Sequence, residues 1–252
     1  MIRIIMNGCN GHMGQVISGI VAEDAQVEIA AGIDLRDDGK NDYPVFASLQ
    51  ECTVEADVLI DFSSPKAFAA MMDGAVEKKL PVVVCTTGLD EAQLVRLKAD
   101  SEKIPVLRSA NMSLGVNLLL KLLKEAAQTL APAGFDIEII EKHHNLKKDA
   151  PSGTALAMAD SINEALDNEY TYKYDRSQDY APREKKEIGI SAVRGGTIVG
   201  THEVLFAGND EIIEFNHMAY SKAVFAKGAV QAAKFLAGKP AGYYNMSSVI
   251  EG

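Results

Sequence analysis

Short apolar runs recur along the first half of the chain and alternate with segments that have helical spacing. The runs predict five buried strands: Ile2–Met6, Val27–Ile33, Ala56–Phe62, Pro81–Cys85 and Ile104–Leu107. Apolar residues at positions 16, 17, 20 and 21 predict a helix after the first strand, and further helices are expected over Pro65–Lys79 and from Asp90. Strands that alternate with helices predict a parallel, doubly wound, Rossmann-like sheet, which binds its ligands at the carboxyl ends of the strands.

The second half of the chain changes pattern after a long helix that is expected over Ser113–Leu130. Polar and apolar residues alternate in four segments, as in half-buried strands: Phe135–Lys142, Lys186–Arg194, Thr197–Phe206 and Glu211–Met218. These segments predict a four-stranded, mostly antiparallel sheet, with a long polar loop over Asn168–Lys186. A closing helix over Ser221–Leu236 is expected to pack back on the first domain. The predicted fold class is therefore α/β, with an α+β second domain.

A glycine-rich turn follows the first strand and opens the first helix. Gly8, Gly11 and Gly14 fall at every third position, and glycine lets the backbone approach a pyrophosphate that faces a helix N-terminus. Asp34 ends the second strand about 20 residues further on, where a ribose-binding carboxylate is expected. The alternatives are a tight turn whose glycines serve packing alone and an exposed loop acid. The context of strand, turn and helix favours a dinucleotide site. The same ligand could touch these residues in the later loops: Thr86, Thr87, Ala110 and Asn111.

Residues 138–155 gather more candidate chemistry than any other stretch. An alternating strand runs into a loop with two adjacent histidines, His143 and His144, and two lysines, Lys147 and Lys148. The Pro-Ser-Gly-Thr that follows starts a helix, whose free backbone N–H groups can bind a carboxylate. Each feature alone has a plain explanation as a solvated loop or an ordinary helix cap. Together they predict an anion-binding site. A metal site is less favoured, because adjacent histidines point apart on an extended chain and no cysteine lies nearby.

Composition limits the kind of partner. The chain has 252 residues, 47% of them hydrophobic, with a formal net charge of −10 and a pI near 5.0. This charge argues against nucleic acid as a partner, and no apolar run is long enough to span a membrane. No signal peptide is visible, and three cysteines without metal-ligand spacing are expected to be reduced thiols. We therefore expect a cytoplasmic protein.

The sequence resembles the 4-hydroxy-tetrahydrodipicolinate reductase (dihydrodipicolinate reductase) family along its whole length. The segments that carry the resemblance are GCNGHMG, VLIDFSSP, CTTGL, SANMSLGVN, EKHHNLKKDAPSGTA and AVFAKGA. The resemblance implies a dinucleotide-binding domain over 1–112, completed by 222–252, and a substrate-binding and oligomerisation domain over 113–221 that builds a homotetramer. It also implies hydride transfer from NAD(P)H that reduces 4-hydroxy-tetrahydrodipicolinate, a cyclic imine dicarboxylate, to tetrahydrodipicolinate in the diaminopimelate route to lysine.

The resemblance also assigns roles to individual residues. His143 is expected to donate or accept a proton, and Lys147 to donate a proton and hold a substrate carboxylate. The other expected substrate-binding residues are His144, Ser152, Gly153 and Thr154. The expected cofactor-binding residues are Gly8, Cys9, Asn10, Gly11, His12, Met13, Asp34, Cys85, Thr86, Thr87, Ser109, Ala110, Asn111 and Met112.

Two positions depart from the pattern of the family and bear on the choice of cofactor. His12 stands where many members carry arginine or lysine, and Leu35 stands where some carry arginine. Asp34 can accept hydrogen bonds from a ribose hydroxyl and repels a 2′-phosphate. We therefore expect NADH to be preferred, with NADPH possible through Arg36.

Two other functions compete with this interpretation. A generic two-domain NAD-dependent dehydrogenase would explain the first half of the chain and leave the DAPSGTA segment without a role. A non-catalytic module that senses NADH would need neither His143 nor Lys147 near a nicotinamide.

Overall fold

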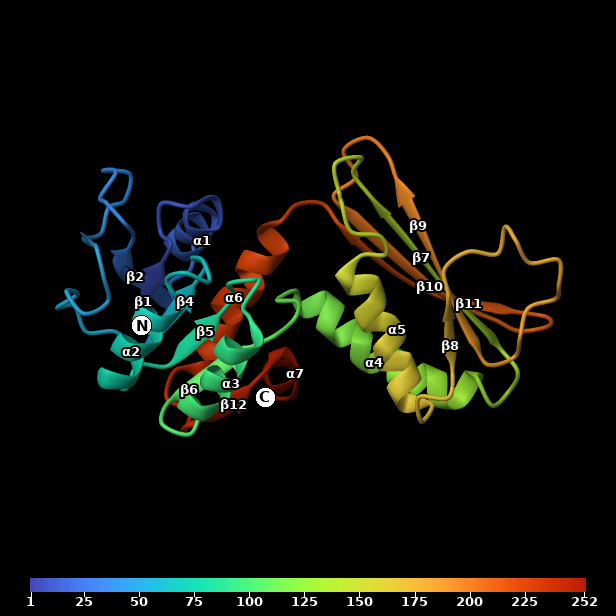
Figure 1. Ribbon diagram of the computed structural model, residues 1–252. Coiled ribbons are helices and arrows are strands. Elements are labelled where there is room, and N and C mark those ends of the chain that lie inside the picture. The colour runs from blue at the N-terminus through green and yellow to red at the C-terminus, as the bar shows by residue number, and fades with distance from the viewer. The chain divides into compact units, whose positions relative to one another are not determined.

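The computed structural model describes residues 1–252 and divides into two compact units, which Figure 1 shows in ribbon form. The first unit consists of Met1–Leu114 and Ala223–Gly252, and the second unit of Gly115–Lys222. The boundaries expected from the sequence, after residues 112 and 221, lie within two residues of these. No helix combines the length and the apolar character that a membrane crossing requires.

The first unit is built on a seven-stranded sheet whose neighbouring strands are all parallel, in the order β12-β6-β5-β4-β1-β2-β3. Its strands are β1 (Ile2–Asn7), β2 (Val27–Ile33), β3 (Val45–Phe46), β4 (Val58–Asp61), β5 (Val82–Val84), β6 (Pro105–Arg108) and β12 (Gly242–Tyr244). The five predicted strands are confirmed. Strands β3 and β12 were not predicted, because two or three residues are too few for a periodic pattern.

Helices cover both faces of this sheet. They are α1 (His12–Ala22), α2 (Phe68–Glu77), α3 (Glu91–Asp100), α6 (Ala223–Leu236) and α7 (Met246–Glu251). The predicted start of α2 at Pro65 is wrong: residues 65–67 form a turn in which Ala67 N–H donates to the Ser64 carbonyl. Helix α3 begins as expected, because the Asp90 side chain accepts from Gln93 N–H in a capping box.

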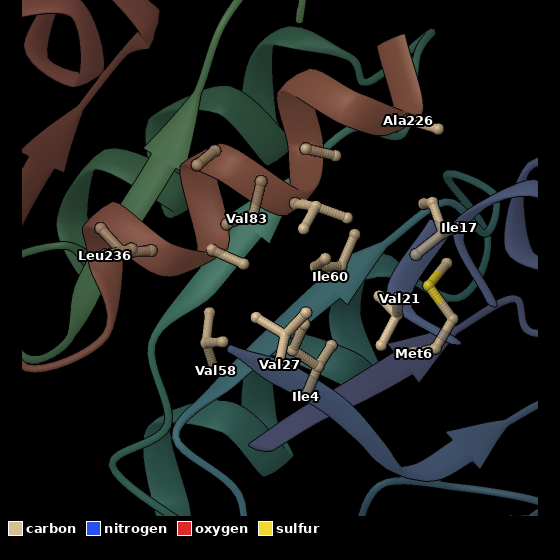
Figure 2. Packing of buried hydrophobic residues seen from close by; sticks show 14 of the residues in the cluster. Ile4, Met6, Ile17, Val21, Val27, Val58, Ile60, Val83, Ala226 and Leu236 are labelled. Atoms are coloured by element: carbon tan, nitrogen blue, oxygen red, sulfur yellow. The ribbon is translucent and has the colours of Figure 1, made fainter. Parts of the chain in front are cut away.

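Two apolar clusters lie on opposite faces of the sheet because alternate residues of each strand point in opposite directions. On one face, Ile4 and Met6 of β1 pack with Ile60 of β4 under α1 and α6, as Figure 2 shows. Helix α6 supplies Ala226 and Leu236 to this cluster, so the prediction that the closing helix returns to the first domain is confirmed. On the other face, the intervening strand residues pack against α2 and α3.

The second unit contains a mixed five-stranded sheet in the order β11-β10-β7-β9-β8. Its strands are β7 (Asp136–His143), β8 (Thr171–Lys173), β9 (Glu187–Arg194), β10 (Gly200–Ala207) and β11 (Ile212–Ala219). Four strands, mostly antiparallel, were expected. Instead β10 pairs antiparallel with β7 and β11, whereas β9 pairs parallel with β7 and β8. The pairing of β7 with β9 is parallel because α5 (Gly153–Ala165) carries the chain back across the sheet between them.

The segment expected to be a long polar loop contains β8, which the sequence missed. Tyr172 of β8 lies opposite Ile188, and its hydroxyl donates to Asp160 of α5. One face of the sheet is covered by α5 and by α4 (Leu114–Leu130), and there Ile137 and Ile139 are fully buried. The predicted alternation in β9 is confirmed for Ile188 and Ile190, which share this cluster. The covered face of the sheet also carries the candidate chemistry.

Candidate functional site

The glycine turn of the first unit is tightly enclosed by backbone. Gly8 has a φ of +82°, and a Cβ on it would lie 2.6 Å from the Phe62 carbonyl oxygen at the end of β4. A Cβ on Gly14 would lie 2.4 Å from the Gly8 carbonyl oxygen. Gly11 is the N-cap of α1, and no side chain caps this helix. The first-turn N–H groups of α1 are therefore available to an anion, as a phosphate-binding turn requires.

Asp34 lies directly beside this turn. Its Oδ2 accepts from Asn10 N–H at 2.9 Å, and its Oδ1 accepts from Leu35 N–H at 2.8 Å. A cavity of about 640 Å³ opens next to these residues. Its lining includes Gly8, Asn10, Gly11, Asp34, Leu35, Arg36 and Asp38. The volume and the mixture of apolar and polar walls suit part of a dinucleotide.

The predicted cofactor residues fall into three groups. Gly8, Asn10, Gly11 and Asp34 line the cavity. Cys9 is buried beneath the turn, and α1 begins with His12 and Met13. The remaining residues follow β5 or β6 at the same edge of the sheet, without lining this cavity: Cys85, Thr86, Thr87, Ser109, Ala110, Asn111 and Met112. The side chain of Met112 is 5% exposed and belongs to the apolar cluster under α6.

A buried carboxyl group under the cavity wall was missed from the sequence. Asp61 ends β4 and is fully buried; Asn7 Nδ2 donates to its Oδ1 at 2.8 Å and Ser63 Oγ at 2.6 Å. Burial raises the pKa of Asp61, and these hydrogen bonds oppose the rise. Asn7 and Ser63 line the cavity, so Asp61 fixes two of its wall residues. The signal in the sequence that could have identified Asp61 is an acidic residue at the end of an apolar strand.

In the second unit, strand register brings five polar side chains onto the covered face of the sheet. Glu141 and His143 continue the side of β7 that carries Ile137 and Ile139. His202 of β10 lies opposite Glu141, and His217 of β11 lies opposite His202. Arg194 of β9 lies opposite His143. Only His143 of these five was predicted as a site residue.

Glu141 is fully buried and accepts four hydrogen bonds. Oε2 accepts from His143 Nδ1 at 2.6 Å and from Arg194 Nη1 at 2.7 Å. Oε1 accepts from Arg194 Nη2 at 2.7 Å and from Ser152 N–H at 3.0 Å. Burial acts to raise the pKa of Glu141, but the bonds from Arg194, His143 and Ser152 outweigh it and hold the pKa below its usual range. Glu141 is therefore ionised at neutral pH.

His202 is 4% exposed and lies between the other two histidine rings of the sheet. Its ring centroid is 5.1 Å from that of His143 and 6.2 Å from that of His217. Nε2 is 2.9 Å from Ser152 Oγ. The pKa of His202 is lowered to about 4, chiefly by burial and also by the neighbouring His143, His217 and Lys147, while Glu141 opposes them. His202 is thus a neutral imidazole at neutral pH.

The start of α5 and the preceding loop bring the predicted substrate-binding residues together. Ser152 is the N-cap of α5, so its Oγ accepts from Ala155 N–H, and its own N–H is bonded to Glu141. Both polar groups of Ser152 are therefore engaged within the protein. Gly153 is exposed at the first turn, and Thr154 is half-buried beside it.

The loop before α5 is held by contacts within it and by one contact from β9. Lys147 N–H donates to the His144 carbonyl, and Lys147 Nζ lies 3.0 Å from Asp149 Oδ2. The hydrogen bond from Lys147 lowers the pKa of Asp149. Arg194 Nη2 donates to the Asp149 carbonyl at 2.6 Å. The loop thus presents an ammonium group close to a helix N-terminus, which is a favourable arrangement for a carboxylate ligand.

A glycine leaves room beside the outer ring nitrogen of His143. Gly200 is the first residue of β10, and a Cβ on it would lie 3.0 Å from His143 Nε2. The inner nitrogen, Nδ1, is held by Glu141. Because an ionised carboxylate can only accept, the neutral imidazole carries its proton on Nδ1 and presents the lone pair of Nε2. Such a group can exchange a proton with a ligand held by Lys147 and α5.

Comparison with known proteins agrees with this geometry. Residues 2–112 match the family described as "Dihydrodipicolinate reductase, N-terminus", and residues 115–250 match "Dihydrodipicolinate reductase, C-terminus". A 4-hydroxy-tetrahydrodipicolinate reductase of Caldanaerobacter subterraneus subsp. tengcongensis is 50% identical over 251 residues, covering 100% of this chain and 99% of its own. The corresponding enzyme of Clostridium tetani is 46% identical over 250 residues, covering 99% and 97%.

Solved structures give the same result. A dipicolinate-bound dihydrodipicolinate reductase from Paenisporosarcina sp. TG-14 superposes with a TM-score of 0.82 at 25% identity, over 99% of both chains. A probable dehydrogenase from Thermotoga maritima, at 12% identity and a TM-score of 0.63, shares the fold alone. Both halves of the chain match one family in order, and its relatives match over nearly their full length. The chain therefore belongs to the 4-hydroxy-tetrahydrodipicolinate reductase (dihydrodipicolinate reductase) family, whose members are oxidoreductases.

Proposed function

We propose that the chain catalyses the NAD(P)H-dependent reduction of 4-hydroxy-tetrahydrodipicolinate to tetrahydrodipicolinate, in the cytoplasmic diaminopimelate route to lysine. The observation that carries the proposal is the buried His143, oriented by Glu141 on the same unit as Lys147 and the N-terminus of α5. The full-length similarity to reductases of this name supports the same substrate. The net change replaces a hydroxyl group by hydrogen, so one hydride and one proton are consumed and one water is released.

In this proposal, residues of the second unit bind the substrate and transfer protons. Lys147 and the backbone at Gly153 and Thr154 hold a substrate carboxylate, since a cation and a helix N-terminus both stabilise negative charge. His144 contacts the substrate from the same loop. His143 exchanges a proton at Nε2, and Lys147 provides a second acidic hydrogen beside it. These groups neutralise the negative charge that hydride addition creates.

The first unit fits a nicotinamide dinucleotide. The uncapped N-terminus of α1 and the close approach at Gly8 and Gly14 suit a pyrophosphate, and Asp34 suits the hydroxyls of the adenosine ribose. When bound, the dinucleotide supplies the hydride. We propose NADH as the preferred form, by about tenfold in kcat/KM, or about 1.4 kcal/mol. The reason is that Asp34 repels a 2′-phosphate while the 82% exposed side chain of Arg36 is paired with Asp38 at 2.8 Å.

The decisive test supplies substrate from a dihydrodipicolinate synthase and follows the loss of absorbance of the reduced cofactor. Lys147→Ala and His143→Ala should each lower kcat by about 10²-fold or more while leaving cofactor affinity unchanged. Lys148→Ala is the matched control, because Lys148 is exposed one residue along the same loop. A chain that binds NADH without consuming it would instead be a sensing module. Comparing NADH with NADPH at low and high salt tests the preference, because a phosphate–Arg36 contact weakens as salt rises.

We also propose that the chain assembles as a homotetramer through the second unit. The face of its sheet opposite α4 and α5 carries exposed apolar side chains, among them Val193, Ile212 and Met218 at 45%, 58% and 57% exposure. Such a face is stabilised when a second copy covers it. Sedimentation equilibrium at assay concentrations should give four times the chain mass. A monomer under those conditions would contradict this assembly.

A further inference from the structure

We propose that Glu141 is a positioning residue for the reaction, and that Arg194 keeps it in the ionised state that this role requires. The proposal rests on the function assigned above to His143. Glu141 is the only group that holds His143 Nδ1, and it also holds the N–H of Ser152 at the start of α5. One buried carboxylate therefore orients both the proton-exchanging ring and the first turn of the carboxylate-binding helix.

The hydrogen-bond pattern requires a carboxylate. Each oxygen of Glu141 faces two donors: Oε2 faces His143 Nδ1 and Arg194 Nη1, and Oε1 faces Arg194 Nη2 and Ser152 N–H. An amide has only one accepting oxygen, so its NH₂ group would face two donors in either orientation. A glutamine at this position would thus either lose the helix start or present a donor to Nδ1. The second outcome favours the opposite tautomer, in which Nε2 carries the proton.

Arg194 makes the buried charge tolerable. Its two Nη atoms bond both Glu141 oxygens in the planar, two-pronged geometry that suits a carboxylate. Nη2 also donates to the Asp149 carbonyl, which ties the loop that carries Lys147 to the end of β9. The charged and titratable groups around the His143 ring are Glu141 on its own strand, Arg194 on β9, and His202 on β10 with His217 beyond it. Lys147 and Asp149 lie on the loop that Arg194 holds.

Glu141→Gln should lower kcat by about 10- to 100-fold, the usual cost of losing a partner that orients a reactive group. KM for the substrate should rise as well, because the start of α5 is released. Glu141→Asp, which keeps the charge, should recover part of kcat. Glu164→Gln is the matched control: Glu164 is 66% exposed and pairs with Lys124 elsewhere in the second unit.

A double variant separates positioning from structural support. Glu141→Gln alone leaves the half-buried Arg194 without its partner and should lower Tm. Glu141→Gln combined with Arg194→Met removes both charges and should recover Tm. Positioning requires that kcat stays low in the double variant although stability returns. Recovery of wild-type kcat together with Tm would overturn the proposal, as would a wild-type kcat in Glu141→Gln.

A spectroscopic readout makes the test independent of the assigned reaction. Long-range ¹⁵N–¹H spectra of the imidazole rings report which nitrogen of each histidine carries hydrogen. His143 should show an Nδ1–H tautomer in the wild type and lose it in Glu141→Gln, while Glu164→Gln leaves it unchanged. If His143→Ala were fully active, the assigned role of His143 would fail while this tautomer experiment still decided whether Glu141 controls the ring. An unchanged His143 tautomer in Glu141→Gln would overturn the proposal.

Discussion

Removal of His202 should flatten the pH dependence of stability on the acidic side. The pKa of His202 is lowered from 6.5 to about 4 in the folded protein, so the folded state excludes a proton that the unfolded chain accepts. Stability therefore falls as the pH drops from 6.5 to 4, because the unfolded state binds more protons in that window. Below pH 4 both states are protonated and the contribution becomes constant.

The size of this effect follows from the two pKa values. A shift of 2.5 units, from 6.5 to about 4, corresponds to a full loss of about 3.4 kcal/mol at about 1.36 kcal/mol per unit. Between pH 7 and pH 5 the accessible part is about 1.8 kcal/mol, because His202 in the unfolded chain is almost fully protonated at pH 5. This is a large fraction of the stability of an ordinary domain.

The assay is urea unfolding of wild type and His202→Gln at fixed protein concentration and at several pH values between 7 and 5. Glutamine keeps a donor for Ser152 Oγ and does not titrate. The difference in unfolding free energy between the two proteins should change by about 1.8 kcal/mol across this range. His12→Gln, at an exposed histidine in the first unit, should show no such change. If the free energy of unfolding changed with pH by the same amount in wild type and in His202→Gln, the lowered pKa of His202 would be refuted.

Three further substitutions test separate features of the structure. Gly228→Ala should destabilise the first unit by about 2–3 kcal/mol in thermal melts, because the new Cβ would lie 1.7 Å from the Met112 carbonyl oxygen. The control is Gly19→Ala on α1, where a Cβ would have nothing within 4 Å and should stabilise the unit slightly. Asp38→Asn should raise kcat/KM for NADPH about threefold by releasing Arg36 and Lys40, and a second change, Arg36→Ala, should cancel the gain. Asp149→Asn should lower the KM for the substrate about two- to fivefold, because it frees Lys147 from its ion pair. A higher KM would show that the Lys147–Asp149 ion pair is needed to hold the loop.

Much of the fold could be predicted because apolar runs that alternate with helical segments leave few alternatives. The five central strands of the first unit are largely buried on both faces, so their sequences are mostly apolar and easy to find. The strands that escaped prediction, β3, β8 and β12, have two or three residues each. Their place in a sheet depends on neighbours that are distant in sequence, as in the pairing of β12 with β6. The sequence alone holds no local pattern for such strands.

Only part of the candidate site could be predicted from the sequence, for a similar reason. His143, Lys147 and the α5 cap lie in one short stretch, so their chemistry could be recognised locally. Arg194 reaches Glu141 across 53 residues, and the relevance of either side chain depends on strand register. Glu141 precedes His143 by two residues and therefore shares its face of β7, which was a signal available in the alternating pattern. His202 offered no such signal beyond its place in an alternating strand.

The return of the chain to the first unit dictates the order in which a ribosome can complete this protein. The strand residues under α6 are made first, but Ala226 and Leu236, which cover them in Figure 2, are among the last to be synthesised. The second unit, Gly115–Lys222, is complete before that cover exists. Throughout the synthesis of the second unit, α1 covers part of the apolar face of the first sheet, and the part that α6 later covers stays exposed to chaperones and to neighbouring chains. The unit whose synthesis starts first is therefore the last to complete its core.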